Sequence, residues 1–336
     1  MAVTLKDIAH KCGLAVSTVS NILNDNATSF ASDRVKLSVK QTAAAMGYRK
    51  HYLSVSLRTK RTLSIGLCLD HILYETRHDF LEAFVQAFNA RGYEVAVNSH
   101  EADPERALSA VRFFQERCKD AIVLFTDFLR DIGPARRQLT DALAGSGVRA
   151  LGVGSELRGL LPCVDVDRDW AFRDCIRRLR RAGHRRTLVV YKTPADFRAT
   201  FAQFSGPEFV LVGDVHTPAD FLQRWPQVRR EHPDATAAFF RTDEIAVAAL
   251  AHFHRTGVRV PQDLAVMSFD RFRFSEYVTP PLTTYAINFD RLGALTFELL
   301  HAWIRGERKL GPAFHETIRP TFIERESHVV TARAGS

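Results

Sequence analysis

The residues from Thr4 to Leu23 read TLKDIAHKCGLAVSTVSNIL, and they carry the pattern of two short helices joined by a tight turn. Thr4 is followed three residues later by Asp7, which is typical of a helix start in which the two residues cap each other. Gly13 suits the turn, and apolar helical spacing resumes at Val16. Two helices packed across so short a turn leave the outer side of the second one free to enter a DNA major groove. The stretch predicts a helix-turn-helix, with an ordinary helical hairpin as the alternative.

The charge of the chain is concentrated around this stretch. Residues 1–61 contain ten Lys or Arg and three Asp, a net charge of +7, whereas the whole chain of 336 residues carries +8. The remaining residues are therefore almost neutral. A compact basic head on a neutral body is what neutralisation of nucleic-acid phosphates requires, because a charge that served only solubility would be spread over the surface.

The composition excludes several other classes of protein. With 46% hydrophobic residues the chain can bury a large core and should form more than one domain. The five cysteines are odd in number, widely spaced and free of any CxxC motif, so the sequence predicts neither a disulfide framework nor a zinc site. No signal peptide or membrane span is evident, and a reducing cytoplasm fits best.

A third helix and a connecting segment follow the helix-turn-helix. Ser32 can cap a helix that ends near Gly47, which completes an all-α head over residues 1–48. Residues 49–61 are basic and polar, with Leu53 and Leu57 four residues apart. We expect them to form a hinge with one helical turn, and a plain linker is the alternative.

From residue 62 the sequence alternates short apolar runs with amphipathic helices, which predicts parallel sheets covered by helices on both faces. One series ends with ALGV at 150–153, and a second begins with CVDV at 163–166. We therefore expect an α/β core with two lobes, an N-lobe at about 62–162 and 288–320 and a C-lobe at about 163–287 and 321–336. Ligands of such sheets bind beyond the carboxyl ends of the strands, so a cleft between the lobes is the expected site.

The order of these parts resembles the lactose-repressor family of bacterial transcription regulators over almost the whole chain. The motifs that carry the resemblance are VTLKDIAHKCGLAVSTVSNIL, MGYRKHYLSVSLRTKRTLSIGL, AGHRR and the long segment from Arg241 to Tyr285, RTDEIAVAALAHFHRTGVRVPQDLAVMSFDRFRFSEYVTPPLTTY. The resemblance implies a homodimer that binds a near-palindromic double-stranded operator. It also implies a core like that of periplasmic sugar-binding proteins, in which a sugar-like effector controls operator affinity.

The resemblance also implies which residues contact DNA. The positions where the recognition helix meets base edges are Val16, Ser17 and Asn21. A valine can pack on a thymine methyl, a serine can donate or accept a hydrogen bond, and an asparagine can pair with the N6/N7 edge of adenine. Leu57 matches a leucine that wedges into the minor groove and kinks the duplex. The other positions placed against DNA are Thr4, Thr18 and Ser54. Asn21 stands where the family often has arginine, and Ala15 replaces a serine that would cap the second helix.

The effector residues are implied in the same way. Arg198 matches an arginine that binds a sugar hydroxyl, and Asp270 matches the acidic residue of the family's FD pair. Thr242 and Asp243 stand at the family's Asn-Asp. Each has a structural alternative, since Asp243 could cap the helix that it begins and Arg198 could be a surface charge. Lys192 is added because it follows the TLVVY strand where the family tends to have small residues.

The cationic side chains around these positions bear on the effector. Lys192, Arg241 and Arg271 would place three cations along one cleft, which favours a sugar that carries a carboxylate or phosphate. The alternative is that they turn outward or pair with Asp243, Glu244 and Asp270.

Two rival functions are a sugar-binding transport protein and an α/β enzyme. A periplasmic binder would need an export signal and no basic head. An enzyme would need a catalytic motif, and neither GxSxG nor a Walker motif is present, while the glycines near 152 lack the GxGxxG spacing of a dinucleotide site. The sequence therefore predicts a DNA-binding repressor, without enzymatic activity or cofactor.

Overall fold

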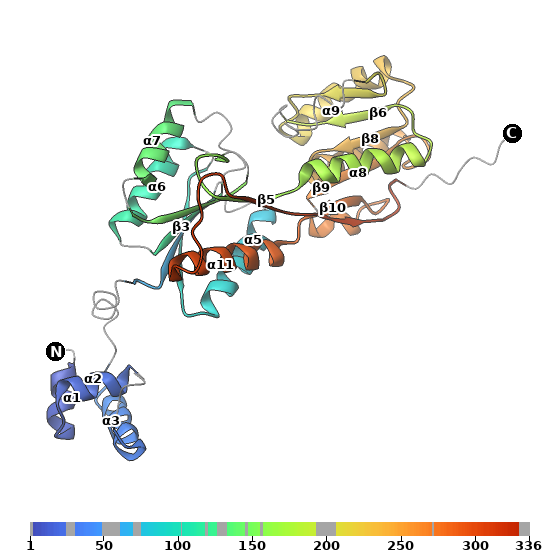
Figure 1. The fold of residues 1–336 in the computed structure, drawn as a ribbon. Helices are drawn as coiled ribbons and strands as arrows, with labels where there is room; N and C mark the ends of the chain where they lie inside the picture. Colours follow the sequence, from blue (N-terminus) through green and yellow to red (C-terminus); the bar gives the residue numbers. More distant parts are fainter. Residues whose placement is uncertain are drawn as a thin grey trace. The chain divides into compact units, whose positions relative to one another are not determined.

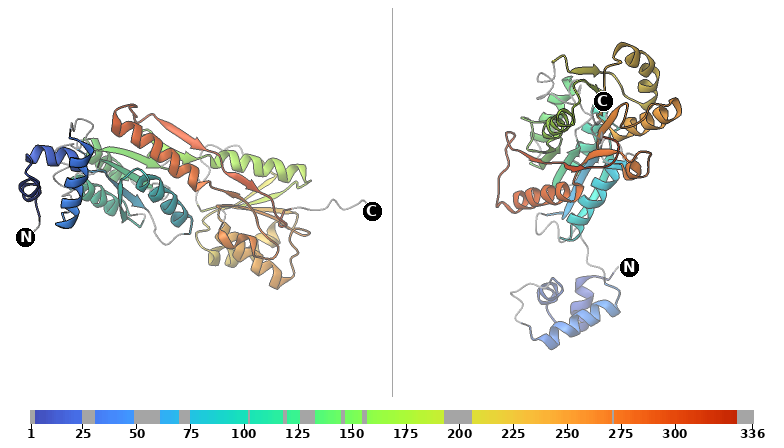
Figure 2. Two further views of the ribbon diagram at one scale, coloured as in Figure 1. Left: turned by 90° about the horizontal axis from the view of Figure 1, so that it is seen from below. Right: turned by 90° about the vertical axis from the view of Figure 1, so that its right-hand side faces the viewer.

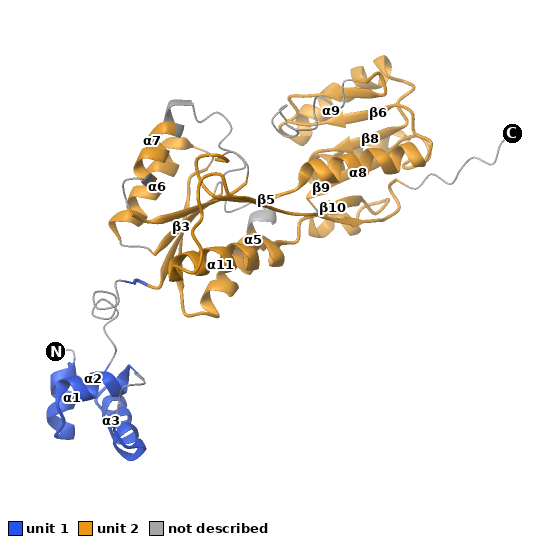
Figure 3. Cartoon of the chain, in the orientation of Figure 1, with its two compact units in different colours: residues 1–62 blue, residues 63–336 orange. Residues whose placement is uncertain are grey.

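The protein is represented by a computed structural model that describes residues 3–24, 31–48, 61–69, 75–101, 103–117, 120–125, 133–144, 147–154, 157–192, 206–270 and 272–328. The chain divides into two compact units, Met1–Thr62 and Leu63–Ser336 (Figure 3). The predicted hinge lies at their junction, and its residues 49–60 are outside the described ones.

The first unit is a small helical head. Its helices are α1 (Leu5–Cys12), α2 (Val16–Leu23) and α3 (Asp33–Ala45) (Figure 1). Gly13 ends α1 with a φ of 63°, in the left-handed region that favours glycine, which is the predicted turn. Apolar side chains of all three helices meet in one core, made of Ile8, Ala9, Val19, Ile22, Val39 and Ala43. The helix-turn-helix therefore has a third helix to pack against, as an independent hydrophobic core requires.

The first lobe of the second unit is built on a parallel sheet. Among the described residues this sheet has the strand order β11-β5-β4-β3-β1-β2. The strands are β1 (Ser64–Leu69), β2 (Glu94–Ser99), β3 (Ala121–Phe125), β4 (Arg149–Val153), β5 (Cys163–Val166) and β11 (His315–Ile318). The helices of this lobe are α5 (Glu75–Asn89), α6 (Pro104–Glu116), α7 (Gly133–Ala144) and α11 (Phe289–Arg305).

The two faces of this sheet carry different helices. Ile122 and Leu124 of β3 pack with α6 and α7, whereas Val123 between them packs with α5 and α11, because successive strand residues point to opposite faces. Figure 2 shows α11, in orange-red, beside α5, in cyan. The two helices approach closely at Gly293, where an added Cβ would lie 3.1 Å from the carbonyl carbon of Ala83.

The second lobe repeats the plan with one antiparallel edge strand. Its strand order is β12-β10-β9-β8-β6-β7 within the described ranges, and β12 alone of these pairs antiparallel. The strands are β6 (Thr187–Val190), β7 (Phe209–Val212), β8 (Ala237–Phe240), β9 (Ala265–Asp270), β10 (Thr283–Ala286) and β12 (Thr321–Ile323). The helices are α8 (Arg168–Arg181), α9 (Pro218–Glu231), α10 (Asp243–Thr256) and the short 3-10 helix η3 (Arg273–Glu276).

One strand lies in a different sheet from the one predicted. We expected CVDV at 163–166 to open the C-lobe, but β5 pairs in parallel with β4 and with β11 in the first sheet. A four-residue apolar run does not encode which sheet it joins, and its partner β11 lies about 150 residues further along the chain. The predicted fold class, an all-α head with a two-lobed α/β core, is confirmed.

The chain crosses between the two lobes after β5, after β10 and after β11, as far as the described residues show (Figure 1). The second crossing runs from Ala286 at the end of β10 to Phe289 at the start of α11, and the third from Ile318 to Thr321. These crossings bring residues from both lobes to one place, which positions the cavity described below.

Candidate functional site

The outer side of α2 is the exposed surface of the head. Val16 is 40% exposed and Ser17 is also exposed, whereas Val19 and Ile22 on the opposite side are buried in the core of the head. Asn21, one turn after Ser17, is half-buried. The predicted base-contacting residues are thus on the side of α2 that a duplex could reach, while the helix is held in place by its inner side.

The two helices of the motif begin differently. Thr4 and Asp7 form a complete capping box, in which the backbone N–H and the hydroxyl of Thr4 donate to Asp7 Oδ2 at 2.8 and 2.7 Å. The N–H of Asp7 donates back to Thr4 Oγ1 at 3.4 Å. The backbone N–H of Thr4, followed by its hydroxyl, lowers the pKa of Asp7. At α2 the cap position is Ala15, and no side chain accepts a hydrogen bond there.

The structure describes some of the other predicted residues and not others. Ser54 and Leu57 of the hinge, Arg198 of the effector set and Arg271 lie outside the described residues. Thr18 is half-buried on α2, and the exposed Thr4 has its hydroxyl engaged with Asp7.

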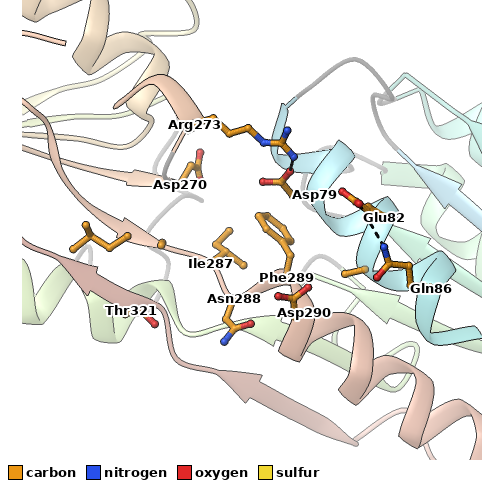
Figure 4. Close-up of a pocket in the computed structure, with 13 residues that line it drawn as sticks. Asp79, Glu82, Gln86, Asp270, Arg273, Ile287, Asn288, Phe289, Asp290 and Thr321 are labelled. Atoms are coloured by element: carbon orange, nitrogen blue, oxygen red, sulfur yellow. Dashed lines mark hydrogen bonds and ion pairs between the residues drawn. The ribbon is translucent and has the colours of Figure 1, made fainter. Parts of the chain in front are cut away.

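A cavity of about 510 Å³ opens between the two lobes (Figure 4). It lies where the second and third crossings pass α5 of the first lobe and the end of β9 in the second. Its lining consists of Asp79, Glu82, Ala83, Gln86, Asp270, Arg273, Ala286, Ile287, Asn288, Phe289, Asp290, Thr321 and Ile323. Its volume is that of a small-molecule site.

Asp270 is the predicted effector residue that lines this cavity. It ends β9 with a φ of 113°, a backbone conformation that side-chain-bearing residues rarely adopt. Such strain costs of order 1–3 kcal/mol and is concentrated at ligand sites. The Asp270 carboxylate lies 3.6 Å from Nη1 of Arg241, and both side chains are largely buried. The geometry thus presents Asp270 to the cavity from a fixed position.

Thr242 and Asp243 lie at the start of α10, next to this region. Thr242 is the cap residue, and its hydroxyl accepts from the N–H of Ile245 at 3.5 Å. Asp243 is fully buried and is not among the lining residues of the cavity. Thr242 rather than Asp243 is therefore the cap residue, and neither of the two is among the lining residues of this cavity.

Of the three predicted cations the structure describes Arg241 and Lys192, and neither lines this cavity. Arg241 pairs with Asp270, which is the alternative that the sequence left open. Lys192 is half-buried just after β6, its carbonyl accepts from the N–H of Asp214 at 3.1 Å, and it does not line the cavity.

The sequence reasoning missed the residues that the first lobe contributes. Arg273 of η3 extends toward α5 and forms an ion pair with Asp79 (Figure 4). On α5, Nε2 of Gln86 donates to Glu82 Oε1 at 3.4 Å. Asp79, Glu82 and Gln86 are spaced three and four residues apart, so they form a polar stripe on one helical face. That stripe was the available signal, but nothing local indicated that it faces the other lobe.

The charges of the lining favour some ligands over others. Among the described lining residues, Asp79, Glu82, Asp270 and Asp290 are acidic and Arg273 is basic. Carboxylates accept hydrogen bonds from hydroxyl groups, and the Asn288 and Gln86 amides can both donate and accept. The described set offers many acceptors to a ligand rich in hydroxyl donors. No cluster of three or more His, Cys, Asp or Glu side chains within the described ranges has the arrangement of a metal site.

The chain thus joins a helical head, which exposes one face of a helix-turn-helix, to an α/β core of two lobes with a cavity between the lobes. A family model described as periplasmic binding protein-like domain matches residues 165–328. None of the helices that the structure describes is long and apolar enough to cross a membrane.

The chain is similar to several known transcription regulators. The transcriptional repressor PurR of Pectobacterium carotovorum subsp. carotovorum is 25% identical over 342 residues, which covers 96% of each chain. Catabolite control protein A of Priestia megaterium is 23% identical over 321 residues, covering 91% of this chain and 94% of that protein. The lac repressor dimer bound to operator and the anti-inducer ONPF superposes with a TM-score of 0.82 at 20% identity, over 98% of this chain and 100% of that chain. The regulator CelR in complex with cellobiose gives a TM-score of 0.67 at 21% identity, over 97% and 99%. The predicted resemblance to the lactose-repressor family is therefore confirmed over nearly the whole chain.

Proposed function

We propose that the chain is a sequence-specific DNA-binding transcription regulator, a repressor, whose operator affinity is set by a small sugar-like effector. The observation that carries the proposal is the head, where α2 exposes Val16 and Ser17 on a unit with a net charge of +7. Similarity to PurR and catabolite control protein A over more than nine-tenths of the chain supports it. A regulator works where the chromosome is, so we place the protein in the cytoplasm.

The head is proposed to bind as one of a pair. A single helix of eight residues presents few side chains to base edges, and two heads on a homodimer would double the contacts and match a near-palindromic operator. Within each head, Val16, Ser17 and Asn21 are proposed to read bases, with Thr4 and Thr18 beside them. Leu57 and Ser54 of the hinge are proposed to contact the minor groove at the operator centre.

The effector is proposed to be a neutral polyhydroxy compound bound in the cavity between the lobes. Among the described lining residues four carboxylates are present with one guanidinium, which favours a neutral sugar over the carboxylate- or phosphate-bearing sugar expected from Lys192, Arg241 and Arg271. Asp270 is the residue proposed to accept from a sugar hydroxyl, and Arg198 remains a proposed second contact. Solved structures of similarly folded regulators, one in complex with cellobiose and one with lactose, support a sugar as the ligand class.

The decisive experiment selects a duplex from a random library with the full-length chain and measures its affinity at several salt concentrations. The logarithm of the binding constant should fall with the logarithm of salt concentration, with a slope of about 0.9 per phosphate neutralised. Lys309→Gln removes an exposed charge from the second unit, away from the head in sequence, and should leave that slope unchanged. A flat salt response would contradict the role of the basic head and favour a transport protein or an enzyme.

The effector is tested separately by thermal-shift screening of neutral sugars, uronic acids and sugar phosphates. A neutral sugar should raise the melting temperature of the wild type and not of Asp270→Asn. Stabilisation by a sugar phosphate that Lys192→Ala abolishes would instead restore the anionic ligand while leaving the repressor function intact.

A further inference from the structure

The carboxylate of Asp243 is the centre of a buried hydrogen-bond cluster in the second lobe. Oδ1 accepts from the hydroxyls of Ser268 at 2.7 Å and Thr284 at 2.6 Å. Oδ2 accepts from the backbone N–H of Phe272 at 2.9 Å and from the hydroxyl of Ser275 at 2.5 Å. Asp243 and all three hydroxyl-bearing residues are completely buried.

The two oxygens serve different parts of the lobe. Ser268 lies on β9 and Thr284 on β10, so Oδ1 ties two neighbouring strands to the start of α10. Phe272 and Ser275 belong to the segment that leaves β9 and forms η3, so Oδ2 holds that segment. The same carboxylate therefore links this segment to strands β9 and β10 of the sheet.

This segment carries two of the residues that line the cavity. Asp270 lies two positions before Phe272. Arg273 directly follows Phe272 and forms an ion pair with Asp79 of the first lobe (Figure 4). The segment is otherwise short of regular structure, since η3 has four residues. Two of its backbone hydrogen bonds are local, from the N–H of Ser275 to Phe272 and from the N–H of Tyr277 to Phe274, and the carbonyl of Ser275 also accepts from the N–H of Leu282 at 2.8 Å.

A buried carboxylate is costly unless each lone pair has a donor. Burial raises the pKa of Asp243, and the hydrogen bonds from Ser275, Thr284, Ser268 and Phe272 oppose that rise. A sheet can be joined to a helix by apolar packing alone, and this lobe already has a large apolar core on the same face of α10. A carboxyl group with four hydrogen-bond donors at this place therefore does more than join the helix to the sheet.

We propose that Asp243 is a positioning residue for the effector cavity, whose Oδ2 fixes residues 272–276 and so sets how Arg273 and the nearby Asp270 face the ligand and the other lobe. The inference rests on the proposed function, because that function assigns the effector to this cavity. The geometry on which it depends can be tested without either ligand or DNA.

Two serines offer a matched pair of variants. Ser275→Ala removes one hydroxyl from the segment side of the carboxylate, and Ser268→Ala removes one from the strand side, by the same chemical change at equal burial. Hydrogen exchange of the full-length chain then reports each amide of residues 272–277. We expect Ser275→Ala to accelerate exchange there about tenfold, as loss of one hydrogen bond to a charged group predicts, beyond any global change in stability. Ser268→Ala should leave residues 272–277 within about twofold of the wild type after the same correction.

Asp243 itself provides the conservative test. In Asp243→Asn the amide oxygen can still accept from Phe272, while the amide nitrogen can donate to the hydroxyls of Ser268 and Thr284. We expect Asn to keep most of the protection of the Phe272 amide and Asp243→Ala to lose it. If the alanine variant does not fold, the serine pair decides the question.

The proposal is overturned if Ser268→Ala and Ser275→Ala accelerate exchange of residues 272–277 equally, or if neither does. Either result would make the cluster a general stabiliser of the lobe. Because the measurement uses neither DNA nor effector, its failure is distinguishable from a failure of the repressor assignment.

Discussion

The start of α2 offers the sharpest test of the link between the sequence of the head and its stability. Ala15 occupies the cap position with φ −64° and ψ 144°, the extended backbone that a cap residue needs, but it has no side chain that can accept a hydrogen bond. The change Ala15→Ser supplies that acceptor without moving the backbone, because Ala15 is exposed and the hydroxyl has room. The amides that it would satisfy are those of Ser17 and Thr18, at the second and third positions of the helix.

The expected gain is about 1 kcal/mol, within the range of roughly 0.5–2 kcal/mol for serine caps. Helix α1 has the same kind of cap in place. The Thr4 hydroxyl accepts from the Asp7 N–H, and the Asp7 carboxylate accepts from the Thr4 N–H. A gain of about 1 kcal/mol corresponds to about a fivefold smaller population of α2 in its locally unfolded form. For a head of this size it should also raise the melting temperature of unit 1 by about 4–8 °C.

Hydrogen exchange of the full-length chain measures this directly through the amides of α2. Ala15→Ser should increase their protection about fivefold, and Thr4→Ala should decrease protection in α1 by a similar factor. Ser32→Ala is the matched control, because Ser32 caps α3 without a side-chain hydrogen bond and its removal should change little. The reasoning is refuted if Ala15→Ser leaves α2 unchanged while Thr4→Ala destabilises α1.

Three further predictions concern base readout, pH and the contact between the lobes. Asn21→Ala should relax preference at one base pair per half-site by about 1–3 kcal/mol, and uniform weakening on all duplexes would make it a backbone contact. Burial raises the pKa of Asp174, but hydrogen bonds to its carboxylate, the strongest from Arg178, lower the pKa by more. The pKa of Asp174 is therefore below its usual value. Stability from Asp174 is therefore present above about pH 4 and is lost below it; denaturation of Asp174→Asn should show a deficit at pH 7 that shrinks toward pH 3, and a constant deficit would contradict this. The partly exposed Asp79–Arg273 ion pair should give a coupling energy of about 0.2–1 kcal/mol in a double-mutant cycle, and this energy should fall as the salt concentration rises. A coupling energy independent of salt would contradict an ionic contact between the two side chains.

Local chemistry in the sequence was enough to define the head and the class of core. The capping residues Thr4 and Asp7, the turn glycine Gly13 and the apolar spacing through Val19 and Ile22 act over a few residues, so they can be read directly from the chain. Alternating apolar runs and amphipathic helices likewise predict parallel α/β lobes, because their periodicity is local.

Only the tertiary structure decided which segments share a sheet and which side chains share a cavity. β5 belongs to the first sheet because it pairs with β4 on one side and with β11, far along the chain, on the other. Asp243 turned inward because Ser268, Ser275 and Thr284 converge on it from three other elements. Arg273 met Asp79 across 194 residues of sequence. Periodicity fixes the face on which a side chain lies, but the partner of that face is set by long-range packing, and the character of the cavity depends on those partners.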